Sequence, residues 1–124
     1  MKYLLDSNIL IGIAIAQNDM LRANIAECDV GDLATSAISF AEVAYGSMRG
    51  KPPFLDDLRV LSEEVEVLPF DDAAALVYAS LPFKRASYDR LIAAHALSLG
   101  LTVVTDNEAD FADVPGLKVE NWTV

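Results

Sequence analysis

Cysteine, histidine and positive charge are scarce in this chain of 124 residues, which contains one cysteine, one histidine and nine lysines and arginines. The single thiol, Cys28, forms no internal disulfide, whereas small secreted domains usually carry an even set of cysteines. We therefore expect a protein of the reducing cytoplasm. No serine can be grouped with a histidine and an acid into a nucleophilic triad, and no glycine-rich phosphate loop occurs. These absences favour water as the nucleophile of any hydrolytic reaction.

Long apolar segments are also missing. The longest one, Ile9 to Ala16, is interrupted by Gly12 and falls far short of the ~20 residues that a membrane-spanning helix needs. It lacks the basic leader and the small-residue cleavage site of a signal peptide. We expect a buried helix in this segment, no membrane partner and a cytoplasmic location.

Acidic residues outnumber basic ones by nineteen to nine, so the formal net charge is −10. Such a charge repels nucleic acid at long range and argues against a protein that coats DNA or lies on a membrane surface. It does not exclude an enzyme that acts on RNA, because a bound cation and a local basic patch reverse the sign of the field within a cleft. It favours a basic protein partner.

The hydrophobic pattern predicts a single α/β domain over residues 1–124, with 53% hydrophobic residues to build its core. Short strand-like segments alternate with longer helical ones, which is typical of βα units around a mainly parallel sheet. Strands are expected at about residues 2–6, 33–35, 65–70, 102–105 and 117–121. Helices are expected at about residues 8–16, 19–27, 54–64, 73–81 and 87–99. A further helix is expected to begin at Ser39 and to end between Gly46 and Gly50.

Four acidic residues stand where we expect a hydrophobic strand to hand over to a helix: Asp6, Glu42, Asp89 and Asp106. The carboxyl ends of neighbouring parallel strands meet at one edge of the sheet, which is where ligands of open α/β sheets lie. Carboxylates that crowd together repel one another unless a cation joins them. Because an all-oxygen ligand set favours Mg²⁺ or Mn²⁺ over Zn²⁺, the four acids predict a metal-dependent phosphodiesterase site.

Each of these acids also has a purely structural explanation. Asp6 suits the N-cap of the first helix, and Glu42 suits the third position of a capping box that begins at Ser39. Asp89 would complement the helix dipole from a first turn, and Asp106 would be a turn residue. Helix caps have no reason to lie near one another, whereas ligands of one ion do. The shared sheet edge therefore separates the two interpretations.

The sequence leaves two candidates for the residue that completes the acidic group. Asp110 lies four positions after Asp106 and would share its face in a helix, and Asn107 offers a neutral oxygen that binds or orients water. The pair Lys84 and Arg85 is a candidate for holding a substrate phosphate, and the alternative is an exposed pair that aids solubility.

The only histidine, His95, lies six residues after Asp89, which is roughly 240° around a helix at about 100° per residue. We therefore expect His95 to point away from the acids and to have a structural role.

Five segments together are similar to the PIN domain and, within it, resemble the VapC-type toxin ribonucleases of bacterial and archaeal toxin–antitoxin pairs. The resemblance runs from Tyr3 to Trp122. It is carried by residues 3–11 (YLLDSNILI), 36–46 (SAISFAEVAYG), 88–97 (YDRLIAAHAL), 104–111 (VTDNEADF) and 114–122 (VPGLKVENW).

The resemblance implies a three-layer α/β/α sandwich around a parallel sheet, Mg²⁺-dependent cleavage of single-stranded RNA with Mn²⁺ as the other ion to consider, a homodimer and a cognate antitoxin. Carried over by position, Asp6 and Asp89 would be the principal metal ligands and Glu42 would complete the pocket. The last acidic position of the pocket corresponds to Asp106 or to the adjacent Asn107.

By the same resemblance, Thr105 would orient a ligand or a water from the end of its strand. The runner-up hypothesis is a catalytically silent PIN-like module that binds only a partner or RNA. An aspartyl-phosphate phosphohydrolase is disfavoured, because its second acid is replaced by Asn8 in this chain.

Overall fold

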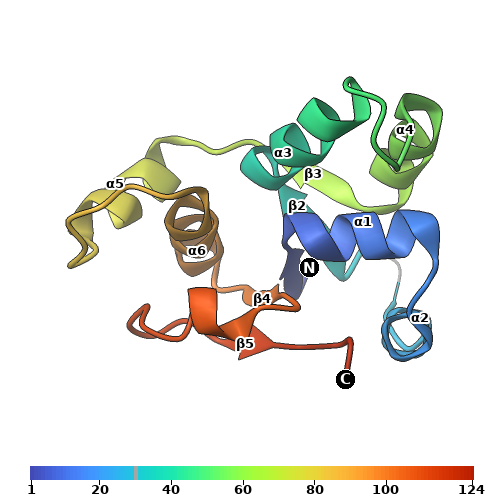
Figure 1. Cartoon of the computed structure of the whole chain (residues 1–124). Coiled ribbons are helices and arrows are strands. Elements are labelled where there is room, and N and C mark those ends of the chain that lie inside the picture. Colours follow the sequence, from blue (N-terminus) through green and yellow to red (C-terminus); the bar gives the residue numbers. More distant parts are fainter. Residues whose placement is uncertain (30) are drawn as a thin grey trace.

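The computed structural model describes residues 1–29 and 31–124. In these residues the expected alternation of strands and helices is confirmed (Figure 1). The elements, in chain order, are β1 (Tyr3–Leu5), α1 (Ser7–Ile15), α2 (Asp19–Ala26), β2 (Leu33–Ser36), α3 (Ala37–Ser47), α4 (Leu55–Glu64), β3 (Glu66–Leu68), α5 (Asp72–Ser80), α6 (Tyr88–Leu99), β4 (Thr102–Val104), the 3₁₀ turn η1 (Glu108–Asp110) and β5 (Val119–Glu120).

The five strands of the described residues form one sheet in the order β3-β2-β1-β4-β5, and every pairing is parallel. The central strand β1 is followed in the sequence by β2 on one side, while β4 lies on its other side. The strand order therefore reverses between β1 and β4. In open α/β sheets, the crevice beyond the carboxyl ends of the strands at such a switch point is where ligands bind.

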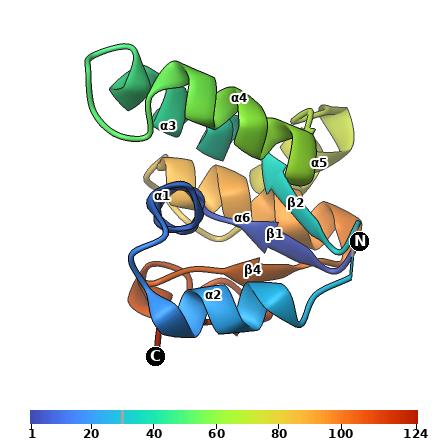
Figure 2. The same ribbon diagram turned by 90° about the vertical axis from the view of Figure 1, so that its right-hand side faces the viewer.

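Side chains alternate between the two faces of the sheet and create two cores. Leu5 and Val104 pack with residues of α1, α2 and α4 on one face. Leu4 and Val103 pack on the other face, mainly against α6. Figure 2 looks onto α1 and α2, with the sheet and then α6 behind them, and α5 packs on the outside of α6 (Figure 1). The expected α/β/α sandwich is confirmed.

Helix α3 begins earlier than the sequence pattern predicts. Its N-cap is Ser36, whose Oγ accepts a hydrogen bond from the Ile38 amide at 3.1 Å, so the expected start at Ser39 was wrong. The Ser36 hydroxyl also lies 2.8 Å from Nδ1 of His95. This buried contact ties α6 to the start of α3, and His95, which is 2% exposed, therefore has a structural role.

The ends of α6 follow from local chemistry. Ser87 caps its first turn by accepting a hydrogen bond from the Arg90 amide, and Gly100 ends it in the left-handed conformation at φ 68°, where glycine has no Cβ to clash. Across residues 1–29 and 31–124, no helix has the length and apolar character needed to cross a bilayer.

Candidate active site

Asp6 lies at the bottom of the crevice between β1 and β4. Its backbone amide donates to the Val104 carbonyl (3.0 Å), which fixes the residue directly beyond the sheet. Its side chain caps α1 by accepting a hydrogen bond from the Ile9 amide at 3.2 Å, and it accepts a second one from the Thr105 hydroxyl at 2.5 Å. The cap and the strand end therefore hold one carboxylate in a single orientation.

The environment of Asp6 disfavours its charged form. The side chain is 6% exposed, and burial raises its pKa to about 6, with Asp106 and Asp89 adding repulsion. The hydrogen bonds from Thr105 and Ile9 work in the opposite direction, because they stabilise the carboxylate. A buried acid with a raised pKa beside other acids is what a cation would stabilise in its ionised form.

Glu42 approaches the crevice from α3, at the sixth helical residue. The capping-box interpretation of Glu42 was wrong, because the helix begins at Ala37 and the carboxylate does not lie in its first turn. Instead, Oε1 of Glu42 accepts a hydrogen bond from the Ser7 hydroxyl at 3.1 Å. That contact brings α3 and the first turn of α1 together above Asp6.

Asp89 lies in the first turn of α6 and is half-buried. Burial raises its pKa, and the nearby carboxylates of Asp110 and Glu42 raise it further. A hydrogen bond between the Asp89 and Asp110 carboxyl groups also favours the protonated form of Asp89 and raises its pKa. Asp89 follows a loop after α5 rather than a strand, which corrects the expectation that all four acids follow strands.

The far wall of the crevice comes from the segment after β4. Asp106 and Asp110 are both exposed there. Oδ1 of Asp106 accepts a hydrogen bond from the Asn8 side chain at 3.3 Å. Asn107 donates from its side chain to Asp110 at 2.8 Å and from its backbone to the Thr105 hydroxyl at 3.0 Å.

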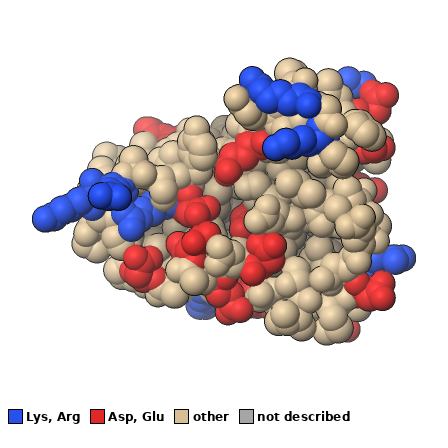
Figure 3. Space-filling model, viewed as in Figure 1, with Lys and Arg blue, Asp and Glu red and all other residues tan. Residues whose placement is uncertain are grey.

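Five acids therefore gather at the carboxyl edge of the sheet, and we call this group the acidic pocket. Its members are Asp6, Glu42, Asp89, Asp106 and Asp110. Acidic side chains fill the middle of the face shown in Figure 3, with basic side chains on both sides of them. The sequence predicted the first four members and left Asp110 open, and the mutual repulsion felt by Asp6 and Asp89 links all five.

The acids of the acidic pocket are not arranged as a complete set of metal ligands. In the part of the chain that the structure describes, no three acidic, histidine or cysteine side chains stand close enough together to hold a metal ion as they are placed. The hydrogen bonds from Ser7 and Asn8 use one oxygen each of Glu42 and Asp106. Since a carboxylate has about four lone-pair sites, these acids keep acceptor capacity. The donors are all hard oxygens, a set that fits Mg²⁺ or Mn²⁺.

Two polar residues of the pocket were not predicted as site residues. Ser7 and Asn8 follow Asp6 in the first turn of α1 and donate hydrogen bonds to Glu42 and Asp106, respectively. The signal in the sequence is weak, because it consists only of two polar side chains directly after an N-cap aspartate. Their partners lie 35 and 98 positions away, so only the folded chain reveals them.

Lys84 and Arg85 lie in the exposed loop between α5 and α6. They line a hollow of about 250 Å³ together with Arg90, whose side chain holds the loop by donating to the Arg85 carbonyl at 2.7 Å. Arg90 also lies over the Phe83 ring, 3.9 Å from its centroid. Figure 3 shows basic side chains at this end of the molecule, beside the acids but not among them.

The chain is similar to known proteins over almost its full length. The sequence model of the PIN domain matches residues 3–117. The protein named tRNA(fMet)-specific endonuclease VapC from Salmonella typhimurium is 30% identical over an alignment of length 131, which covers 98% of this chain and 98% of that protein.

Solved structures give the same result. A chain in the crystal structure of VapBC2 from Rickettsia felis, bound to a DNA fragment from their promoter, superposes with a TM-score of 0.86 at 27% identity and covers 98% of this chain and 99% of that one. VapBC-5 from Mycobacterium tuberculosis, described as a member of the VapBC family of toxin–antitoxin systems, gives a TM-score of 0.68 at 28% identity, with 99% and 98% coverage.

Proposed function

Because this chain belongs to the PIN domain family and, within it, to the VapC ribonucleases, we propose that it is a Mg²⁺-dependent endoribonuclease that cleaves single-stranded regions of RNA. PIN-domain nucleases of the VapC type are metal-dependent in general. We propose further that the protein is the toxin of a type II toxin–antitoxin pair. Both steps rest on the family and on the composition of the acidic pocket.

The observation that carries the proposal is the gathering of acids at the sheet's switch point. Asp6 and Thr105 follow the adjacent strands β1 and β4, and Glu42 and Asp89 come from helices α3 and α6. This arrangement raises the pKa of both Asp6 and Asp89, which costs folding free energy. A group of acids placed at such a cost is better explained by a bound cation than by four independent caps.

The roles of the side chains follow from their positions. Asp6 and Asp89, with Glu42 and Asp106, would hold the cation. When bound, Mg²⁺ supplies a Lewis acid that activates water and neutralises charge on the phosphodiester. Thr105 fixes the Asp6 carboxylate, and Ser7 fixes Glu42 where it can orient the water for in-line attack. Asn107 and Asp110 close the far wall.

The charge on the outer rim directs the substrate. The acidic pocket repels a phosphate chain, whereas Lys84 and Arg85, in the loop between α5 and α6, attract it. We propose that these two residues hold a phosphate next to the one that is cleaved. The approach of the RNA would then depend on the basic end, and its cleavage on the acids.

Cleavage of a transfer RNA pool by the purified protein, with Mg²⁺ or with EDTA, tests the function. Asp6→Asn should lower the rate by more than about a hundredfold, because it removes a charge that would hold the ion. Asp57→Asn, an exposed acid in the first turn of α4, is the matched control and should cleave like the parent. Parent protein that folds but leaves RNA intact in Mg²⁺ would favour the catalytically silent module.

We also propose an antitoxin as the protein partner, a homodimer as the assembled form and the cytoplasm as the location. The support is the relation to chains solved in VapBC complexes and the net charge of −10. A basic segment of an antitoxin would complement this charge and would compete with RNA for the acidic pocket.

A further inference from the structure

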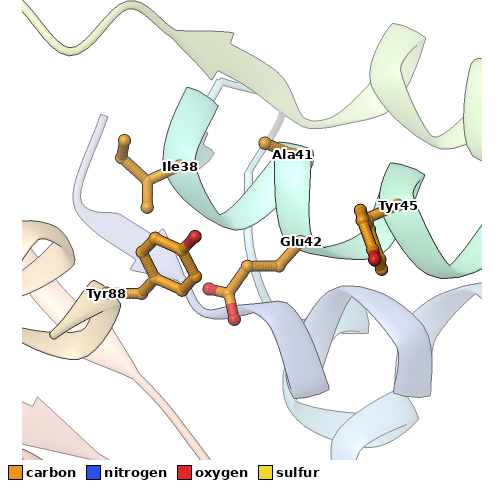
Figure 4. A pocket seen from close by; sticks show the side chains of 5 residues that line it. All are labelled: Ile38, Ala41, Glu42, Tyr45 and Tyr88. Carbon is orange, nitrogen blue, oxygen red and sulfur yellow. The ribbon is translucent and has the colours of Figure 1, made fainter.

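An aromatic groove opens beside the acidic pocket. It has a volume of about 530 Å³ and is lined by Ile38, Ala41, Glu42, Tyr45 and Tyr88 (Figure 4). Four of these residues are spaced i, i+3, i+4 and i+7 along α3, so they form one face of that helix. Tyr88, the first residue of α6, faces them from the opposite side and lies immediately before Asp89.

The two tyrosines are unusually exposed for aromatic residues that line a hollow. Each has 62% of its surface accessible. Figure 4 shows the Glu42 carboxylate between the two rings, with Tyr88 on the side of Ile38 and Tyr45 one helical turn further along α3. Exposed apolar surface that is concave and bordered by polar groups marks a binding site more often than a folding requirement.

Tyr45 is held in place by a neighbouring arginine. The guanidinium carbon of Arg49 lies 3.3 Å from the centroid of the Tyr45 ring, and Arg49 donates a hydrogen bond to the Tyr45 carbonyl at 3.0 Å. One face of the ring is therefore covered by a cation. A ring fixed in this way loses little side-chain entropy when a ligand stacks on it.

We propose that a nucleobase of the RNA substrate, next to the cleaved phosphate, stacks in this groove on Tyr45 and Tyr88. This inference rests on the proposed ribonuclease function and adds a base-binding subsite to it. Unpaired bases are recognised by stacking on aromatic rings, and removal of such a ring weakens binding by about 5- to 160-fold. The volume of the groove lies within the range of small-molecule sites.

The charge of the groove selects the base rather than the phosphate. Its only charged lining residue among the described residues is Glu42, which repels a phosphate but accepts hydrogen bonds from the amino and imino groups of a base. Glu42 belongs to both the groove and the acidic pocket. A base in the groove would therefore leave its own phosphate beside the acids, and basic side chains lie on both sides of the acids, where the rest of the strand would pass (Figure 3).

A set of short single-stranded RNA oligonucleotides tests the subsite directly. Each oligonucleotide carries 2-aminopurine at a different internal position. Binding is measured by quenching of this base in the Asp6→Asn background, so that the readout does not depend on cleavage. Tyr45→Ala and Tyr88→Ala should each weaken binding by about 5- to 160-fold and remove the quenching. Tyr45→Phe and Tyr88→Phe keep a stacking ring and should restore both.

The matched control is Phe54→Ala, which removes an exposed ring outside the groove (59% accessible) and should leave binding and quenching unchanged. In the cleaving parent, the two alanine variants should raise KM more than they lower kcat.

Alanine variants that bind and quench like the parent would overturn the subsite, even if the parent cleaves RNA. Variants that lose a homodimer or capture of an antitoxin, with RNA binding intact, would overturn it too and assign the groove to a protein. Failure of the parent to cleave any RNA would refute the ribonuclease instead.

Discussion

Replacement of Asp6 by asparagine should make the folded protein more stable at neutral pH, although it removes an acid that we propose to be essential for cleavage. Burial raises the pKa of Asp6 to about 6, against an ordinary value of 3.8. The folded state therefore binds this proton more tightly than the unfolded chain does. Stability falls as the pH rises from about 4 to about 6 and then stays at its lower level, because both states are ionised above that range.

The magnitude follows from the two pKa values. A difference of about two pH units at about 1.4 kcal/mol each amounts to about 3 kcal/mol at pH 7. Asparagine has nearly the same shape, its oxygen can accept from the Ile9 amide, and its NH₂ group can donate to the Thr105 hydroxyl. Since these contacts survive with altered geometry, we expect a gain of about 1–3 kcal/mol in the free energy of unfolding.

Urea unfolding in EDTA, at several pH values between 4 and 8, measures this gain. The difference between Asp6→Asn and the parent should be near zero or negative at about pH 4, grow up to about pH 6 and be constant above. Asp57→Asn should show no such growth, because Asp57 is exposed. Added Mg²⁺ should stabilise the parent more than the Asp6 variant. A gain that does not vary with pH, or a loss at pH 7, would refute the electrostatic reasoning.

Two further predictions concern the surface. The double variant Lys84→Ala/Arg85→Ala should bind RNA more weakly, and the slope of log Kd against log salt concentration should fall by about 0.7 for each phosphate that the protein no longer neutralises. Arg22→Ala on α2 is the control and should change neither the affinity nor the slope. An unchanged slope in the double variant would show that the pair does not contact the substrate. Expression together with the neighbouring genes should yield a complex of this chain with a small basic protein. Light scattering should then give the mass of a dimer of that complex. Isolation of the chain alone, as a monomer, would contradict both the antitoxin and the homodimer.

Much of the fold could be predicted because the local signals agree with one another. The β-branched segment at 102–105 contains β4, and Gly100 ends α6 where a left-handed residue is needed. The start of α3 could not be located, because Ser36 and Ser39 are both good caps. Tertiary contacts make Ser36 the cap. Strand β2 pairs with β3 as far as Ser36, and the Ser36 hydroxyl forms a hydrogen bond with His95, 59 positions away.

The composition of the acidic pocket could be predicted better than its geometry. Sequence spacing placed Asp6 and Asp106 after strands, and this is where they lie. The same reasoning misplaced Asp89, which reaches the pocket because α6 crosses one face of the sheet and begins at the carboxyl edge. The contacts of Ser7 and Asn8 depend on strand order, and segments as short as three residues carry no pairing information of their own.

The strand order explains why the acidic pocket lies at this place, and it bears on our proposal that the pocket holds a hydrated ion. After β1 the chain passes into α1 and packs on one face, whereas after β4 it passes to Phe111 and Val114 on the other face. The two segments diverge, so neither can cover the gap between the strand ends. Exposure consequently increases from Asp6 at the bottom, through half-buried walls, to Asp106 at the rim.

Mg²⁺ gives up its water reluctantly and usually keeps several waters when carboxylates bind it. A crevice that is closed at its base and open at its rim would supply carboxylates on one side and leave the other side to water and phosphate. A cage with acids on every side would exclude the substrate. The incomplete grouping of the acids, with separate hydrogen bonds to Ser7, Asn8 and Thr105, is therefore compatible with catalysis.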